Sequence, residues 1–169
     1  MKKAVWSGII VAVGMLALST PVFAQASANA SVSVTANINA KAKLTIDSAS
    51  ITFPAVVGDP DSTPSISATA LGIDVKARTS ANGSVTLTVV ATDDLKAGTA
   101  TIAISNLTWA SSGTNFAGSG TSNTVTPQTV ASFTGSGSYS GSQTYALANS
   151  WAYSTGTYTT SLTYTLTAP

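Results

Sequence analysis

Aspartates are the only carboxylates in this sequence, so they must supply any acid–base chemistry that it performs. The chain has no His, no Cys and no Glu, which removes the usual general base, the thiol nucleophile and the commonest zinc ligands. A glycosidase would need one Asp with a raised pKa in a cleft, and nothing in the sequence indicates one. We therefore expect no enzymatic activity and no cofactor.

Two pairs of aspartates could instead hold a metal ion through their oxygen atoms. Asp59 and Asp61 share a Gly- and Pro-containing loop, and Asp93 and Asp94 could join them as ligands. Ca²⁺ takes six to eight oxygen ligands, more than these residues offer. Acidic residues in solvated turns explain both pairs, and calcium stays an alternative.

Four aromatic residues could form a stacking platform for sugar rings. They are Trp109, Trp151, Tyr153 and Tyr158. Aromatic side chains of all-β domains more often belong to the core or cover an edge. An alternative function follows from them: a self-complete secreted sandwich that binds polysaccharide or another surface component.

The first 24 residues have the composition of a bacterial signal peptide. Lys2 and Lys3 precede an apolar stretch at residues 4–17, and Val22-Phe23-Ala24 fits the small-residue cleavage rule. The apolar stretch is short for a bilayer span, so no membrane insertion is expected after cleavage. Export leaves about 145 residues, one domain, and we expect the protein to be secreted through the periplasm to the cell surface.

The exported part has a nearly balanced charge. Five basic residues face six Asp, giving a net charge of −1. Nothing in this composition attracts nucleic acid. Without cysteine, stability must come from burial and backbone pairing alone.

Period-two alternation dominates the exported part and predicts an all-β protein. In residues 31–46 every second side chain is apolar, and the last segment, residues 158–166, repeats the pattern. Further strands are expected near residues 50–53, 65–70, 73–77, 84–90, 99–105, 129–133 and 143–148. This many short strands in one domain predicts an immunoglobulin-like β-sandwich.

Turn residues divide these strands. Asn82-Gly83 tolerates the positive φ of a tight turn, so residues 73–77 and 84–90 are expected to pair as a hairpin. Residues 54–64, with three prolines, are expected to be a loop or an interrupted edge strand, and the Gly- and Ser-rich residues 111–127 are expected to be a loop.

The first alternating segment is too long for one sandwich strand. Its sixteen residues would span roughly 50 Å at about 3.3 Å each, whereas an ordinary strand covers about 17–20 Å. Either the chain bends near residues 37–39 and pairs twice within its own domain, or its N-terminal part completes another molecule. An unpaired amphipathic strand is an aggregation hazard unless a partner edge receives it.

Several short motifs carry a family resemblance through their order along the chain. They are ASVSVTANINA at residues 30–40, ITFP at 51–54, IDVKA at 73–77 followed by Asn82-Gly83, and STGTY at 154–158 before the last alternating strand. Together they resemble spore coat protein U-like and related chaperone–usher pilin subunits, over most of the exported chain.

The resemblance implies a six-stranded sandwich that lacks its final strand. A periplasmic chaperone and an outer-membrane usher would handle the subunit, and the N-terminal extension of the next subunit would complete it. Residues 25–38 would then be the donor extension and residues 39–169 the sandwich domain of a fibre (pilus or fimbria) or coat subunit, with an adhesive role open. The implied donor side chains are Val32, Val34, Ala36 and Ile38.

The chain departs from the family in its cysteines. Coat protein U-like subunits generally carry one cysteine shortly after the donor segment and another in the strand before the hairpin. Here residues such as Ala42 and Ala77 stand in those places, so a disulfide is impossible.

Overall fold

The chain is an all-β sandwich in a computed structural model that describes residues 30–55, 58–116 and 118–169. One compact unit spans Asn37–Pro169. Apart from a single 3-10 turn at Ile104–Asn106, all regular elements of the described residues are strands, and none of these residues forms a helix that could cross a membrane. The all-β prediction is confirmed, while the predicted signal peptide lies outside the described residues.

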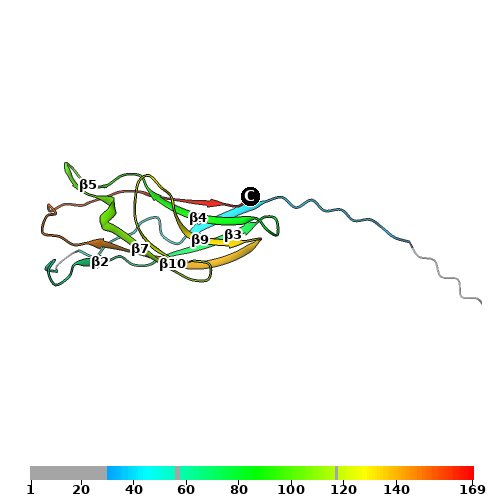
Figure 1. The fold of residues 1–169 in the computed structure, drawn as a ribbon, viewed down its shortest axis with the longest axis horizontal. Helices are drawn as coiled ribbons and strands as arrows, with labels where there is room; N and C mark the ends of the chain where they lie inside the picture. Colours follow the sequence, from blue (N-terminus) through cyan, green and yellow to red (C-terminus); the bar gives the residue numbers. More distant parts are fainter. Residues whose placement is uncertain (1–29, 56–57, 117) are drawn as a thin grey trace, which may run out of the picture. The chain divides into compact units, whose positions relative to one another are not determined.

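Two antiparallel sheets form the layers of the sandwich (Figure 1). The larger has the order β1-β3-β10-β7-β8, with β2 also paired to β10; the smaller has the order β11-β4-β9; and β5 and β6 form a separate pair. The strands are β1 (Lys41–Ile46), β2 (Ser65–Ser67), β3 (Leu71–Arg78), β4 (Ser84–Ala91), β5 (Leu95–Ala97), β6 (Ala100–Ile102), β7 (Leu107–Ser112), β8 (Ser119–Thr121), β9 (Gln128–Thr134), β10 (Gly137–Ala148) and β11 (Leu162–Thr167).

This strand order is that of an immunoglobulin-like domain. A constant-type immunoglobulin sandwich has strands A, B, E and D in one sheet and C, F and G in the other. The order β1-β3-β10-β7 corresponds to A-B-E-D, and the pair β11-β4 corresponds to F-C. Within the described residues, no strand pairs with the outer edge of β11, which is the place of strand G.

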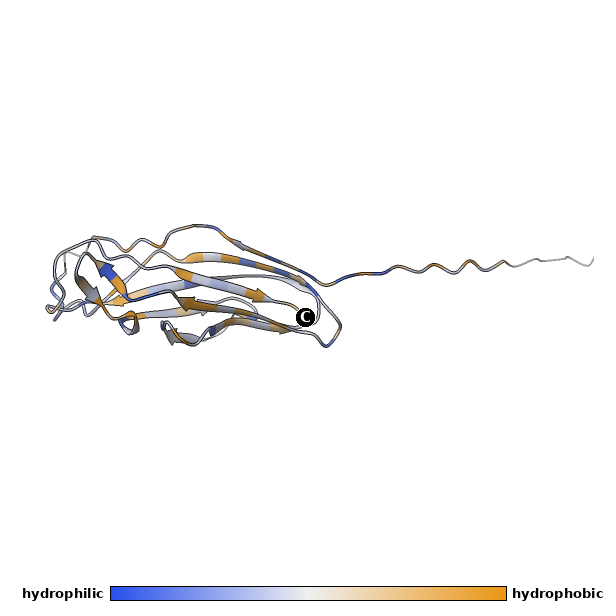
Figure 2. Ribbon diagram, turned by 90° about the horizontal axis from the view of Figure 1, so that it is seen from above, coloured by the Kyte–Doolittle hydropathy of each residue, from blue (hydrophilic) through white to orange (hydrophobic). Residues whose placement is uncertain are grey.

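Alternation builds the core between the two sheets. On β3 and β4 every second residue is buried, because successive side chains of a strand point to opposite faces. Val75, Val85 and Val130 are fully buried. Apolar and polar residues alternate visibly along the strands in Figure 2, as a sheet with one wet face requires.

The predicted hairpin at Asn82-Gly83 is wrong. β3 pairs with β1 and β10, whereas β4 pairs with β11 and β9, so the turn crosses from one sheet to the other. Neither residue adopts a positive φ. Space favours Gly83 instead, since an added Cβ would overlap the Thr79 side chain.

Some predicted strand limits also differ from the structure. Residues 50–53 form no strand, although Ile51 and Phe53 pack against the core. The predicted strand at 99–105 is divided into β6 and the 3-10 turn, and β8 lies within the predicted loop at 111–127. β10 begins at Gly137 rather than near 143, because its Gly- and Ser-rich start resembles a loop in composition.

The loop prediction for residues 54–64 is confirmed for the described residues of that range, none of which is in a strand.

Ala42 and Ala77, the residues in place of the family's cysteines, lie directly opposite each other on β1 and β3. The neighbouring bond from Asp47 N–H to Gly72 O, at 3.1 Å, places Ala42 and Ala77 in a non-hydrogen-bonded pair. In such pairs the Cα atoms are about 4.5 Å apart. This spacing lies within the range that a disulfide spans.

Candidate functional site

The implied donor side chains lie in a segment that forms no strand. Residues 30–40 are without regular structure, and only Lys41–Ile46 of the sixteen-residue alternating segment pairs as β1. Val32 and Val34 are 86% and 88% exposed and Ile38 is 70% exposed, and Ala36 is exposed as well. The segment therefore presents alternating apolar side chains to solvent.

The outer edge of β11 has free backbone groups. Ser161 O accepts a hydrogen bond from Thr92 N–H at 2.9 Å, and along an antiparallel strand alternate residues direct both backbone groups to the same neighbour. Odd-numbered residues of β11 therefore bond to β4. The N–H and C=O groups of Leu162, Tyr164 and Leu166 point to the opposite side, where the described residues provide no strand.

The same reasoning applies to β1 at the edge of the other sheet. Asp47 N–H donates to Gly72 O, so the odd-numbered residues of β1 bond to β3. The backbone groups of Ala42, Leu44 and Ile46 then face away from β3, and within the described part of the chain no other strand pairs with β1. β1 and β11 are thus two free edges.

Apolar side chains line the space between these two edges. We call this set the seam; it consists of Leu44, Ile46, Leu162, Tyr164 and Leu166. All five pack against the core but remain only partly buried, in contrast to the fully buried residues of β3 and β4. Further burial of these apolar side chains would stabilise the fold only if another segment of polypeptide covered the free edges.

The seam is narrower than an inserted strand requires. Strands that flank a shared neighbour lie about 9.6 Å apart, twice the usual spacing of about 4.8 Å. Cα atoms of β1 and β11 come within 8 Å of each other. To accept a strand, β1 must therefore move away from β11 by at least about 2 Å.

A buried polar cluster fixes β11 against the larger sheet. Tyr145 and Tyr164 share a hydrogen bond of 2.8 Å between their hydroxyls, and the Tyr164 hydroxyl donates to Gln143 Oε1 at 2.5 Å. Burial raises the pKa of Tyr164 to about 12, and burial followed by the neighbouring Tyr164 raises the pKa of Tyr145. Both hydroxyls are protonated at neutral pH, and the cluster ties β10 to β11 through the core.

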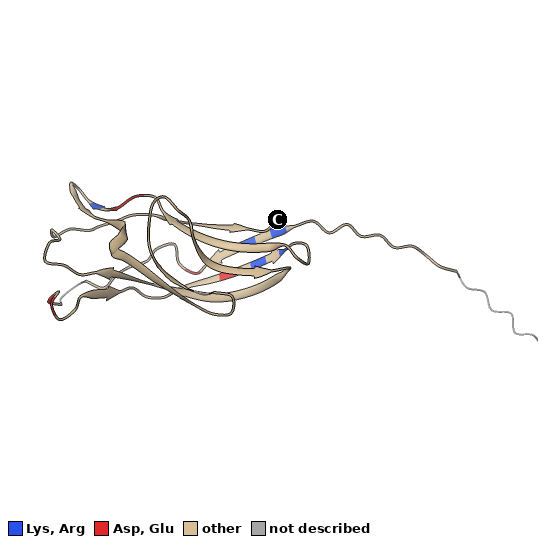
Figure 3. Ribbon diagram, viewed as in Figure 1, with Lys and Arg blue, Asp and Glu red and all other residues tan. Residues whose placement is uncertain are grey.

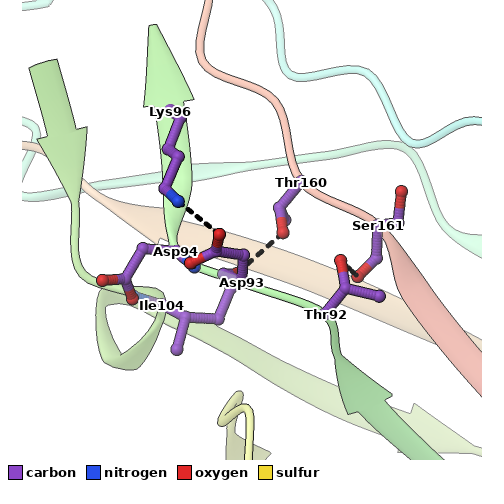
Figure 4. Close-up of polar contacts among 7 residues, drawn as sticks. All are labelled: Thr92, Asp93, Asp94, Lys96, Ile104, Thr160 and Ser161. Atoms are coloured by element: carbon purple, nitrogen blue, oxygen red, sulfur yellow. Dashed lines mark hydrogen bonds and ion pairs between the residues drawn. The ribbon is translucent and has the colours of Figure 1, made fainter. Parts of the chain in front are cut away.

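The start of β11 is anchored to the segment after β4 (Figure 4). The Thr92 hydroxyl donates to Ser161 O at 3.2 Å, and the Thr160 hydroxyl donates to Asp93 O at 2.7 Å. These contacts hold β11 on β4 from one side only, and its seam side stays free.

Asp93 and Asp94 serve this local structure. Lys96 Nζ forms an ion pair with the Asp93 carboxylate, and the hydrogen bond from Lys96, followed by that from Asp94 N–H, lowers the pKa of Asp93. The Asp94 carboxylate accepts the Ile104 N–H at 2.8 Å.

Asp59 and Asp61 do not converge with these residues. Asp59 Oδ1 accepts the Asp61 N–H at 2.9 Å and closes its own turn. Among the residues that the structure places, no three carboxylates gather into a group that could hold a metal ion. The idea that both Asp pairs share one calcium ion is therefore wrong.

The four aromatic residues do not form a platform either. Trp109 is buried, and its Nε1 donates to Gln128 Oε1 at 2.8 Å, so it belongs to the core. Tyr153 and Tyr158 are half-buried. Trp151, at 71% exposure, is the one of the four that presents its ring to solvent.

The seam residues on β1 and β11 were missed as functional residues at the sequence level. Their alternation is visible in residues 41–46 and 162–167. Nothing in the sequence shows that these two strands, far apart along the chain, lie on the same side of the sandwich.

Comparison of the chain with family models, with curated proteins and with solved structures finds no match. A function is therefore inferred from the chain's own residues.

Proposed function

We propose that this chain is a structural subunit of an exported bacterial surface fibre or coat, and that its copies assemble by donor-strand exchange. One observation carries the proposal: the free edge of β11 and an exposed apolar alternating segment occur in the same chain. In this mechanism residues 25–38 of one copy insert between β1 and β11 of another, at the place of strand G.

The backbone groups of the seam supply sequence-independent affinity. The even-numbered residues of β1 and β11 direct N–H and C=O groups toward the inserted strand, which can bond to both edges as in β-strand addition. The alternating side chains then set the register, because a shift by one residue would turn every apolar side chain outward.

The apolar donor side chains supply the larger part of the energy. Burying Val32, Val34 and Ile38 contributes about 1.5–3 kcal/mol each, or roughly 5–9 kcal/mol before the entropy of ordering the segment is subtracted. This is comparable with the net stability of a whole domain, so completion by a neighbour decides whether the assembly persists.

A subunit with an uncovered seam requires protection before assembly. Free strand edges lined by apolar side chains promote non-specific pairing. The resemblance to chaperone–usher subunits points to a periplasmic chaperone that covers the seam. At an outer-membrane usher, the donor segment of the next subunit would then replace the chaperone. No nucleic acid or cofactor enters this function.

Removal of residues 25–37 tests the proposal. The shortened chain should still accept a strand but donate none, so a synthetic peptide of residues 25–38 should bind it one to one and raise its melting temperature. A peptide carrying Val34→Asp is the matched control. Failure of the wild-type peptide to bind, with a folded shortened chain, would contradict the proposal.

A second candidate function is binding of polysaccharide through Trp151, favoured by the exposure of this ring. Replacement of Trp151 by Ala should then abolish retention on a polysaccharide column. If the chain is instead a pilin-like subunit that does not bind polysaccharide, it should form detergent-resistant ladders that dissociate only on strong heating. Trp151→Ala should then leave these ladders intact.

A further inference from the structure

Four basic residues lie close together at one end of the unit Asn37–Pro169 (Figure 3). Lys41 lies opposite Arg78, and Lys43 lies opposite Lys76, on the exposed face of β1 and β3. We call these four residues the basic end. Like charges directly opposite each other across strands are destabilising, and none of the four makes an ion pair with a described residue. An external anionic group would relieve this repulsion.

Four of the six aspartates lie toward the opposite end, which we call the acidic end (Figure 3). They are Asp59, Asp61, Asp93 and Asp94, and Lys96 pairs with Asp93. Of the other two, Asp47 bonds to Gly72 in the middle of the sheet, and Asp74 lies beside Lys76 on the exposed face of β3. The turn that holds Asp59 and Asp61 is bound to the end of β10, because Asn149 Nδ2 donates to Thr63 O at 2.9 Å.

The length of β10 gives the separation of the two ends. Its residue Gly137 lies opposite Ala77 near the basic end, and Ala148 lies opposite Ser65 near the acidic end. Eleven steps of about 3.3 Å make this separation roughly 36 Å. The four basic residues carry a charge of +4, which the neighbouring Asp74 reduces to +3, and the acidic end carries a charge of −3. The two ends are therefore complementary in charge and too far apart to neutralise each other within one molecule.

The donor segment is joined to its own sandwich at the basic end. Arg78 Nε donates to Asn39 O at 3.0 Å, and only two residues separate Ile38 from Lys41. A copy that binds the donor side chains must consequently lie within about 10 Å of the basic end.

The direction of the donated strand decides which part of the neighbour meets the basic end. β11 runs from Leu162 at the acidic end to Thr167 at the basic end, because these residues lie opposite Ala91 and Thr86 of β4. A donor antiparallel to β11 brings its own basic end to the acidic end of the acceptor. A parallel donor would bring two basic ends together.

We propose that the occupant of the basic end is the acidic end of a second copy, and that this charge pairing orients donor-strand exchange head to tail and accelerates it. The inference rests on the proposed function. It commits to a second copy rather than an anionic polysaccharide, because the matching carboxylates are in the same chain and the whole exported part is nearly neutral. A heterologous contact of this kind continues into an open filament.

Two charge variants of the full-length exported chain test the pairing. Lys43→Glu with Lys76→Glu removes the positive charge of the basic end, and Asp59→Asn with Asp61→Lys removes the negative charge of the acidic end. The side chains of Lys43, Lys76 and Asp61 make no hydrogen bond within the described structure, and the amide oxygen introduced by Asp59→Asn can still accept the N–H of residue 61, so both variants should melt as the wild type does. Growth of detergent-resistant ladders is followed in roughly 20 mM and roughly 500 mM NaCl, where screening differs strongly.

Each variant alone should assemble at least tenfold more slowly than the wild type at low salt, since steering of this kind changes association rates by about 10–10³. In an equimolar mixture the unchanged acidic end of the first variant can pair with the unchanged basic end of the second, so mixed dimers should form at the wild-type rate, and high salt should remove the differences. Wild-type rates for both separate variants would overturn the charge pairing and leave donor-strand exchange intact. If the wild type is retained on heparin, only the basic-end variant loses this retention, and neither variant changes the assembly rate, the charge pairing is overturned in favour of a polyanion. Wild-type protein that never forms ladders would contradict the proposed function itself.

Discussion

Replacement of Val34 by Asp distinguishes a subunit that donates its N-terminal segment to a neighbour from one that keeps the segment in its own sandwich. Val34 is 88% exposed in the subunit, and substitutions at exposed positions usually change the free energy of unfolding by no more than about 0.5 kcal/mol. We expect the Val34→Asp subunit to unfold at the same urea concentration as the wild type. If the segment were a buried strand of its own sandwich, the same change would destabilise the subunit by several kcal/mol.

In assembly the expected loss is large. Burial of Val34 in the seam of a neighbour contributes about 1.5–3 kcal/mol, and an unpaired carboxylate placed there carries a further desolvation penalty of several kcal/mol. A total loss of at least about 3 kcal/mol corresponds to more than a hundredfold weaker association, at about 1.4 kcal/mol for each factor of ten.

The assay compares the unfolding midpoint with the yield of detergent-resistant ladders. Thr35→Asp is the matched control, because it introduces the same charge on the opposite face of the segment, and it should assemble close to the wild-type yield. Equal ladders from Val34→Asp and Thr35→Asp would refute the role of the apolar face. So would a strongly destabilised Val34→Asp subunit.

Three further outcomes follow from the structure. The double variant Ala42→Cys/Ala77→Cys should form an intramolecular disulfide under oxidising conditions, since the two residues form a non-hydrogen-bonded pair; free thiols by mass spectrometry would show that the register of β1 is different. The free energy of unfolding should be level up to pH 10 and fall between pH 10 and about 12. An unfolded Tyr has a pKa near 10, whereas the pKa of Tyr164 is raised to about 12. In this range the folded chain therefore holds a proton that the unfolded chain releases. Urea unfolding at rising pH measures this fall, Tyr164→Phe should make it shallower, and a stability independent of pH would contradict the buried cluster. Trp109→Ala should destabilise the subunit by about 3–5 kcal/mol whereas Trp151→Ala should change its stability little, and equal unfolding midpoints for the two variants would contradict the burial of Trp109.

The fold class could be predicted from the sequence because period-two alternation is a local property. The alternation in residues 84–90 and 129–133 predicts strands that the structure contains as β4 and β9. Strands with weak alternation were missed, as in the Gly- and Ser-rich start of β10, where pairing with β3 overrides low intrinsic strand preference.

Pairing between strands was less predictable than their existence. Asn82-Gly83 is typical of a tight hairpin, yet the polypeptide turns there from one sheet to the other, since the apolar faces of both β3 and β4 are satisfied only by packing against each other across the core. The donor side chains could be chosen from the sequence, because alternation identifies them. The seam could not, because it depends on which strands end up at the two edges.

Amide hydrogen exchange along β11 tests the central claim most directly. The N–H groups of Leu162, Tyr164 and Leu166 point to the free edge, whereas those of Thr163 and Thr165 bond to β4 and serve as internal controls. We predict fast exchange at the first three amides in the isolated subunit and slow exchange at all five in the assembled fibre. Equally slow exchange of the first three amides in the isolated subunit, or their continued fast exchange in the fibre, would contradict the insertion of a donated strand beside β11.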